Sequence, residues 1–116
     1  MFNYKKLILV ISDLLKLKEY RKLKANGYTD LNVDVLYREG NVKRIALAHN
    51  YELNGDIIPD PDMEVDVDHA METVNAKTFQ NIYTHSEVGE GDVGLQNELN
   101  EFLDTWLTNL IDQGHK

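Results

Sequence analysis

Acidic residues alternate with mostly apolar residues along the chain from Asp60 to His69. The acidic positions are Asp60, Asp62, Glu64, Asp66 and Asp68, and the positions between them are Pro61, Met63, Val65, Val67 and His69. Side chains two residues apart on a strand share a face, so the pattern predicts a strand with one apolar and one acidic side. Neighbouring carboxylates would lie about 6.6 Å apart. Each repulsion then costs about 2.5 kcal/mol at an effective dielectric near 20. We therefore expect another group to offset this charge.

A divalent cation is one group that could do so. Carboxylate oxygens are hard ligands that suit Ca²⁺ or Mg²⁺, and a turn before the acidic strand could bring several of them together. The candidate ligands are Asp56, Asp60, Asp62 and His49, which would make a metal-binding protein or a small metal-assisted enzyme. The glycine and the glutamate at position twelve of a calcium loop are missing. A competing interpretation is that these are turn carboxylates that accept hydrogen bonds from nearby backbone amides.

A basic protein partner is the second candidate. The acidic row could imitate a row of phosphates and occupy such a partner, and we predict that the interaction surface comprises Asn54, Asp56, Asp60, Asp62, Glu64, Asp66 and Asp68. The competing interpretation is a solvated face that pairs with Arg38, Lys43, Arg44 and the basic N-terminal segment. Our leading hypothesis is a non-enzymatic interaction protein that uses residues 54–68.

The sequence contains little that indicates catalysis. It has no cysteine, which excludes disulfides and thiolate chemistry. It has no zinc-protease motif, nucleophile elbow or phosphate-binding glycine loop. His49 and His69 both fall on the apolar parity of their strands, which is typical of packed histidines, although a general base at His49 is conceivable. We predict no catalytic residue and no cofactor other than the cation considered above.

Length and charge narrow the classes of protein further. The chain has 116 residues, enough for a single domain, and a formal net charge of −8. Residues 1–44 carry a net +5 and residues 45–116 a net −13, so the two parts could complement each other within one molecule or across a dimer. A pI near 4.8 argues against a nucleic-acid partner. No apolar run is long enough to span a membrane. We expect a cytoplasmic protein.

The spacing of apolar residues predicts an α+β domain over residues 1–116. Leucine, valine and isoleucine recur at helical intervals across residues 1–26, and again across 92–113, where Asp92 is the expected cap and Gly114 the expected stop. Between these helices, residues 31–85 alternate with period two and predict about four antiparallel strands, with turns at Glu39-Gly40-Asn41 and Asn54-Gly55-Asp56. Both helices should cover one face of this sheet. Its open edges would also permit a homo-oligomer.

Part of the sequence resembles known families. The block HNYELNGDIIPDPDMEVDVDHA, followed by KTFQNIYT, resembles a family of small uncharacterised bacterial proteins that are often carried on plasmids and other mobile elements. Its recurring pattern falls on His49 to Tyr51, Glu52 to Asp56 and Asp60 to Met63. The segments MEVDVDHAMETVNA and LNEFLDTWLTNLIDQGH are more distantly similar to the YqiB-like domain of unknown function. These resemblances imply a fold and a bacterial mobile-element setting, without a reaction.

Overall fold

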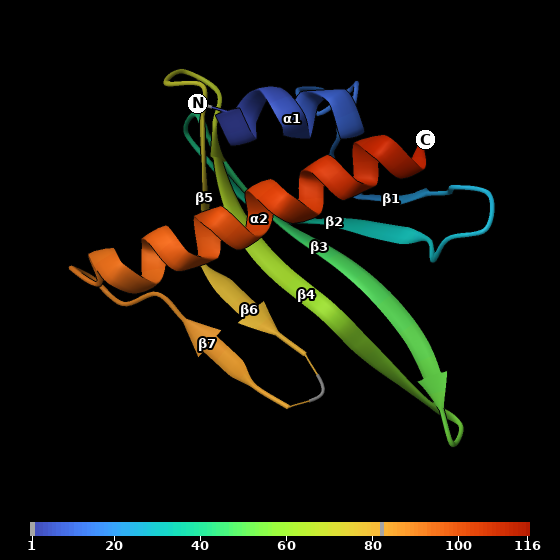
Figure 1. Ribbon diagram of the computed structural model, residues 1–116. Coiled ribbons are helices and arrows are strands. Elements are labelled where there is room, and N and C mark those ends of the chain that lie inside the picture. The colour runs from blue at the N-terminus through green and yellow to red at the C-terminus, as the bar shows by residue number, and fades with distance from the viewer. Residues whose placement is uncertain (1, 82) are drawn as a thin grey trace.

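The protein is described by a computed structural model in which two helices and seven strands follow one another along the chain (Figure 1). The description covers residues 2–81 and 83–116, and the side chains of all of these except residues 2, 51–53 and 57–60. The elements are α1 (Phe2–Val10), β1 (Tyr20–Leu23), β2 (Leu31–Glu39), β3 (Val42–Leu53), β4 (Asp56–Asp68), β5 (Thr73–Ala76), β6 (Thr78–Gln80), β7 (His85–Glu87) and α2 (Val93–Gln113).

The strands form one antiparallel sheet in the order β1-β2-β3-β4-β6-β7. Strand β5 also pairs with β4, on the same edge as β6 but further along the strand. The long hairpin of β3 and β4 extends past the helices in Figure 1, and its turn uses Asn54 and Gly55 at positive φ, as a two-residue hairpin turn requires. The predicted antiparallel sheet is therefore confirmed, with seven strands in place of about four.

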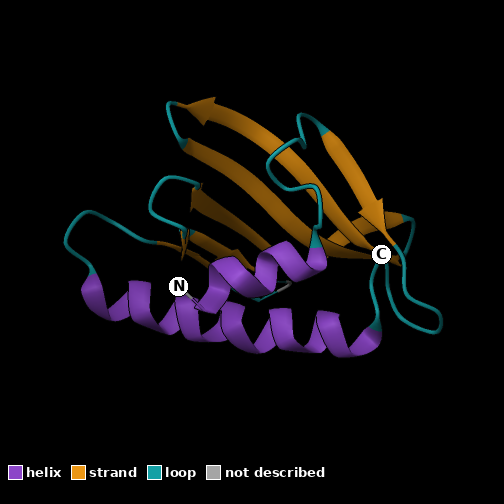
Figure 2. Ribbon diagram, turned by 90° about the horizontal axis from the view of Figure 1, so that it is seen from above, coloured by secondary structure: helices purple, strands orange, loops and turns teal. Residues whose placement is uncertain are grey.

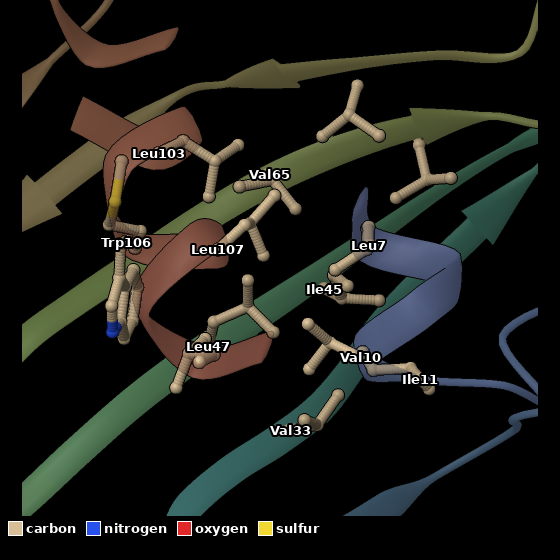
Figure 3. Close-up of a cluster of buried hydrophobic side chains, with 14 of the residues drawn as sticks. Leu7, Val10, Ile11, Val33, Ile45, Leu47, Val65, Leu103, Trp106 and Leu107 are labelled. Carbon is tan, nitrogen blue, oxygen red and sulfur yellow. The ribbon is translucent and has the colours of Figure 1, made fainter. Parts of the chain in front are cut away.

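Both helices pack on one face of the sheet and leave the other face open (Figure 2). The core between these layers is a single cluster of apolar side chains from both helices and from strands β1 to β5. Figure 3 shows its centre, which is formed by Leu7 and Val10 of α1, Ile11 directly after it, three strands and α2. The strands and α2 contribute Val33, Ile45, Leu47, Val65, Leu103, Trp106 and Leu107. Burial of these side chains is the dominant favourable term in folding, and it fixes which face of each strand points toward the helices.

The C-terminal helix agrees with its prediction. Helix α2 begins after Asp92, whose side chain accepts a hydrogen bond from the amide of Leu95, and ends at Gly114, which has the left-handed conformation of a C-cap. The apolar stripe predicted from the sequence supplies Leu99, Leu103, Trp106, Leu107 and Leu110 to the core.

The N-terminal helix is much shorter than the predicted range 1–26. Helix α1 ends at Val10, turns occupy residues 12–16, and β1 then joins the sheet beside β2. Leu14 and Leu17 are nevertheless buried. The apolar spacing that suggested a continuous helix therefore indicates only that these residues are buried. The turns bury Leu14 and Leu17 as well, because the chain folds back over the end of the sheet.

The strands after β4 are also shorter than expected. The part of the chain after β4 holds β5, β6 and β7, each of three or four residues, which accounts for most of the excess over the four strands predicted. Such short strands at a sheet edge carry too few alternating residues to give a clear period. Prolonged pairing with β4 is confined to β5, because β6 pairs with β4 only at Asp62 and Gln80.

Candidate functional site

The acidic side of β4 lies on the open face of the sheet. Met63, Val65 and Val67 are buried against the helices, whereas the alternating residues Asp62, Glu64, Asp66 and Asp68 are partly exposed. The predicted division of this strand into an apolar and an acidic side is therefore confirmed from Asp62 onward. Residues opposite each other in an antiparallel pair share a face. The pairing of Asp34 with Ala46, and of Ala46 with Glu64, therefore adds Asp34 to this face. We call Asp34, Asp62, Glu64 and Asp66 the acidic face.

Arg44 compensates one end of the acidic face. It stands opposite Asp66 in the register of β3 and β4, and its guanidinium pairs with both carboxylate oxygens of Asp66 and, at 3.2 Å, with Glu64. The Tyr37 ring lies 5.6 Å from the guanidinium carbon, within the range of a cation–π interaction. The predicted pairing of Arg44 with the acidic row is confirmed, and a bidentate arginine pair is the strongest form of such a contact.

Asp62 and Asp34 are the members of the acidic face for which the described residues supply no ion pair, and Asp62 is the more buried of the two. Burial raises the pKa of the Asp62 carboxyl above the ordinary value, the charges of Glu64 and Asp34 raise it further, and His85 acts in the opposite direction. Asp62 lies between Ala48 on β3 and Gln80 on β6. No cation lies within ion-pair distance of Asp62 in the described part of the chain. The acidic face therefore carries a half-buried negative charge that the described residues leave unpaired.

Arg38, Lys43 and Lys6, three of the other predicted cations, do not lie on this face. Arg38 stands opposite Lys43 in the register of β2 and β3 and shares its side. Lys43 falls on the apolar parity of β3 and is fully buried on the helix side, where its Nζ atom donates to the carbonyl oxygens of Leu14 and Leu17. Helix α1 also covers that side, and its Lys6 pairs with Asp104 of α2. The expected pairing of the acidic row with Lys43 and with Lys6 of α1 is therefore wrong. Its parity with Ile45 and Leu47 was the sequence signal for the burial of Lys43.

Asp68 serves the local turn. Its Oδ1 atom accepts hydrogen bonds from the amides of Ala70 and Met71, both at 3.0 Å. These bonds stabilise the connection between β4 and β5, as aspartates commonly do in turns. Asp68 is thus a turn residue, and it lies at the end of the strand away from the hairpin tip.

The hairpin tip holds the first two predicted site residues. Asn54 and Asp56 are exposed there, and the side chain of Asp60 lies outside the described residues. The register of β3 and β4 shifts between the pair Ala48 and Asp62 and the pair Asn50 and Pro59. One extra residue of β4 is accommodated at this bulge, so the alternation of faces does not run unbroken from Asp62 to Asp56.

Two of the proposed metal ligands, His49 and Asp62, lie on opposite faces of the sheet. His49 pairs with the buried Leu31 on the helix side of the sheet, whereas Asp62 lies on the open face. The His49 ring packs against Trp106 and His115, with centroids 5.4 Å and 5.7 Å away, and its Nδ1 atom donates to the carbonyl oxygen of Asp30 at 3.0 Å. Burial lowers the pKa of His49. Among the side chains that the structure describes, no group of three or more acidic or histidine residues is arranged to hold a metal ion.

A layer of two helices over a seven-stranded antiparallel sheet, with one open and acidic sheet face, defines the class of this protein. The family model described as "Domain of unknown function (DUF6908)" matches residues 3–116, and the chain belongs to this family. No match was found among curated proteins. No solved structure matched either. None of the described helices combines the length and apolar composition needed to cross a membrane.

Proposed function

We propose that this protein is a non-enzymatic interaction protein that binds a basic protein segment on the acidic face. The proposal rests on one observation, the carboxylate of Asp62, which is partly buried and makes no ion pair with the described residues. This carboxylate is half-buried among other negative charges, and a lysine or arginine from a partner would supply the missing counter-charge. Arg44 shows the same compensation within the chain, because it already pairs with Glu64 and Asp66.

The neighbouring side chains support a protein partner. Tyr20 and Tyr37 are each about half exposed. Their pairing with Asp34 and Arg44 places both on the open face. Tyrosine is enriched at the centres of protein interfaces, where it supplies a large contact area together with a hydrogen-bonding group. Ala46, between Asp34 and Glu64, has only a methyl group, so a long basic side chain can lie between the two carboxylates.

The wider proposal keeps the setting that the resemblance implies. The protein would act in the bacterial cytoplasm, encoded on a mobile element, and the exposed residues Asn54 and Asp56 at the hairpin tip would extend the contact with the partner. We also propose that the chain is distantly related to the YqiB-like domain of unknown function. The predicted homo-oligomer would be a second use of the open sheet edges.

A double variant that replaces two carboxylates by neutral amides of the same size tests the acidic face directly. Replacing Asp34 and Asp62 by asparagine removes two negative charges and leaves the ion pairs of Arg44 intact. The matched control replaces Glu98 by glutamine and Asp112 by asparagine, two exposed residues of α2 on the other side of the molecule. The probe is a capped decapeptide of alternating lysine and threonine, with a glutamate and threonine peptide as the negative ligand.

We expect the wild type to bind the lysine peptide and not the glutamate peptide, with affinity that falls as salt is added. The double variant should bind at least fivefold more weakly, and the control should stay within twofold of the wild type, as measured by fluorescence anisotropy. Equal weakening in both variants would show that only net charge matters, and unchanged binding in the double variant would place the contact elsewhere. Either result contradicts the proposal.

A further inference from the structure

A cavity of about 440 Å³ lies at the outer edge of β5, beside helix α2 and the start of α1. Its lining includes Asn3, Val74, Asn97, Asn100, Glu101 and Asp104. Side-chain amides and carboxylates dominate this list. The cavity is therefore suited to a ligand that both donates and accepts hydrogen bonds.

The backbone of β5 presents unpaired groups to this cavity. Asp66 and Asp68 of β4 stand opposite Asn75 and Thr73 of β5. The amide of His69, the residue after Asp68, bonds to Asn41 just before β3 and so points to the other side of β4. The amides of β4 alternate in direction, so the residues of β5 that bond to β4 are Thr73 and Asn75. Val74 and Ala76 consequently direct their N–H and C=O groups outward, into the space beside α2.

Side chains of α2 already occupy one of these two positions. Asn100 accepts a hydrogen bond from the amide of Ala76 at 2.8 Å through Oδ1, and Gln96 donates to the carbonyl oxygen of Ala76 at 2.6 Å through Nε2. Together the two side chains make the pair of bonds that a neighbouring strand would make. At Val74, neither outward group has a hydrogen-bond partner in the part of the chain that the structure describes.

Asn3 adds a second, independent unsatisfied group at the same cavity. Its side chain is only 9% exposed, and its Nδ2 atom donates to the carbonyl oxygen of Asn100 at 3.1 Å. Its Oδ1 atom is buried and has no hydrogen-bond partner among the described residues. A buried polar atom without a partner is costly to the fold, so the wall of this cavity is incompletely satisfied.

We propose that this cavity binds a short extended peptide segment of a partner protein, one residue of which pairs with Val74 and carries a basic side chain. The N–H and C=O groups of that residue would bond to Val74 and add a partial strand to the edge of the sheet. Its side chain would share the helix-facing side of Val74. It would therefore point toward α2, where Asp104 is already paired with Lys6 and the exposed Glu101 makes no ion pair among the described residues. This carboxylate favours lysine or arginine.

A titration of the ¹⁵N-labelled protein with three capped tripeptides tests this inference by NMR. The first is Thr-Lys-Thr. The second has a methyl group on the main-chain nitrogen of the lysine, which then cannot donate to the carbonyl oxygen of Val74. The third has norleucine in place of lysine. We expect the first peptide to bind in the millimolar range and to shift the amide of Val74 and the side-chain amides of Asn97 and Asn100. N-methylation should weaken binding at least fivefold, and norleucine at least threefold.

The variant Glu101→Gln should weaken binding of the lysine peptide about threefold and leave binding of the norleucine peptide unchanged. The matched control Glu98→Gln, on an exposed part of α2 outside the cavity, should change neither. The inference is overturned if Val74 does not shift at saturating peptide, if N-methylation has no effect, or if Val74 shifts with protein concentration alone, since a second copy would then occupy the edge. Shifts confined to the acidic face would also overturn it while supporting the first proposal.

Discussion

The Nζ atom of Lys43 donates a hydrogen bond of 2.6 Å to the main-chain carbonyl oxygen of Leu14. A second bond of 2.8 Å joins it to the carbonyl oxygen of Leu17. Lys43 is fully buried between the sheet and this turn segment. A lysine of β3 thus satisfies the carbonyl groups of the chain that follows α1, and it holds the path from α1 to β1 against the core.

We expect Lys43→Met to destabilise the fold by about 1–3 kcal/mol, because two buried carbonyl oxygens lose their donor. Removal of a buried charge offsets part of this loss. Urea denaturation followed by circular dichroism would measure the change. The exposed Lys22→Met is the control and should stay within about 0.5 kcal/mol of the wild type. A Lys43→Met variant as stable as this control would contradict a structural role for the two bonds.

His69 should make stability depend on pH below neutrality. Burial lowers the pKa of His69 from its ordinary value of 6.5, and the charges of Lys43 and Arg38 lower it further, while Asp68 opposes them. The unfolded chain therefore binds more protons than the folded protein between the folded pKa and 6.5, so stability falls as pH falls through this window. Between pH 7.5 and 5.5 the wild type should lose more thermal stability than His69→Asn. Parallel losses in both proteins would exclude His69 as the cause.

Asp62→Asn should stabilise the protein at pH 7. Because burial and neighbouring carboxylates raise the pKa of Asp62 above 3.8, its charged form is disfavoured in the fold, and its removal should gain roughly 0.2–1 kcal/mol. The gain should shrink as pH falls through the folded pKa toward 3.8, where the wild-type carboxyl becomes neutral as well. Denaturation at pH 7 and pH 4 measures both effects. A loss of stability at pH 7 would show that an unrecognised contact stabilises the carboxylate.

Arg44 and Asp66 should be energetically coupled. Their side chains are 19% and 23% exposed, against 30% and 46% for Lys6 and Asp104. Lower exposure reduces solvent screening, so a double-mutant cycle with Arg44→Met and Asp66→Asn should give about 1 kcal/mol of coupling. The cycle with Lys6→Met and Asp104→Asn should give less. The reverse order would mean that burial does not govern these two ion pairs.

The features that could be predicted from the sequence are those that depend on neighbouring residues. Asp92 and Gly114 delimit α2 because capping is satisfied within one turn, and Asn54 with Gly55 specifies the turn of the long hairpin because positive φ is a property of those residues. The two sides of β4 follow from alternation alone. The same alternation placed His49 on the apolar side of β3, although its contacts could not be known. It also holds for Lys43, whose burial was not predicted.

The contacts between distant segments required the tertiary structure. Helix α1 ends at Val10, and the chain then folds back so that Leu14 and Leu17 are buried and their carbonyl groups bond to Lys43. Apolar spacing alone cannot distinguish that path from a longer helix. Only the assembled sheet shows that Arg44 reaches Asp66, that Asp62 has no ion-pair partner among the side chains the structure describes, and that His49 and Asp62 lie on opposite faces. Local residue preferences fixed the long strands β2, β3 and β4 and the caps of α2, whereas packing across the sheet decided which charges of the described residues were paired.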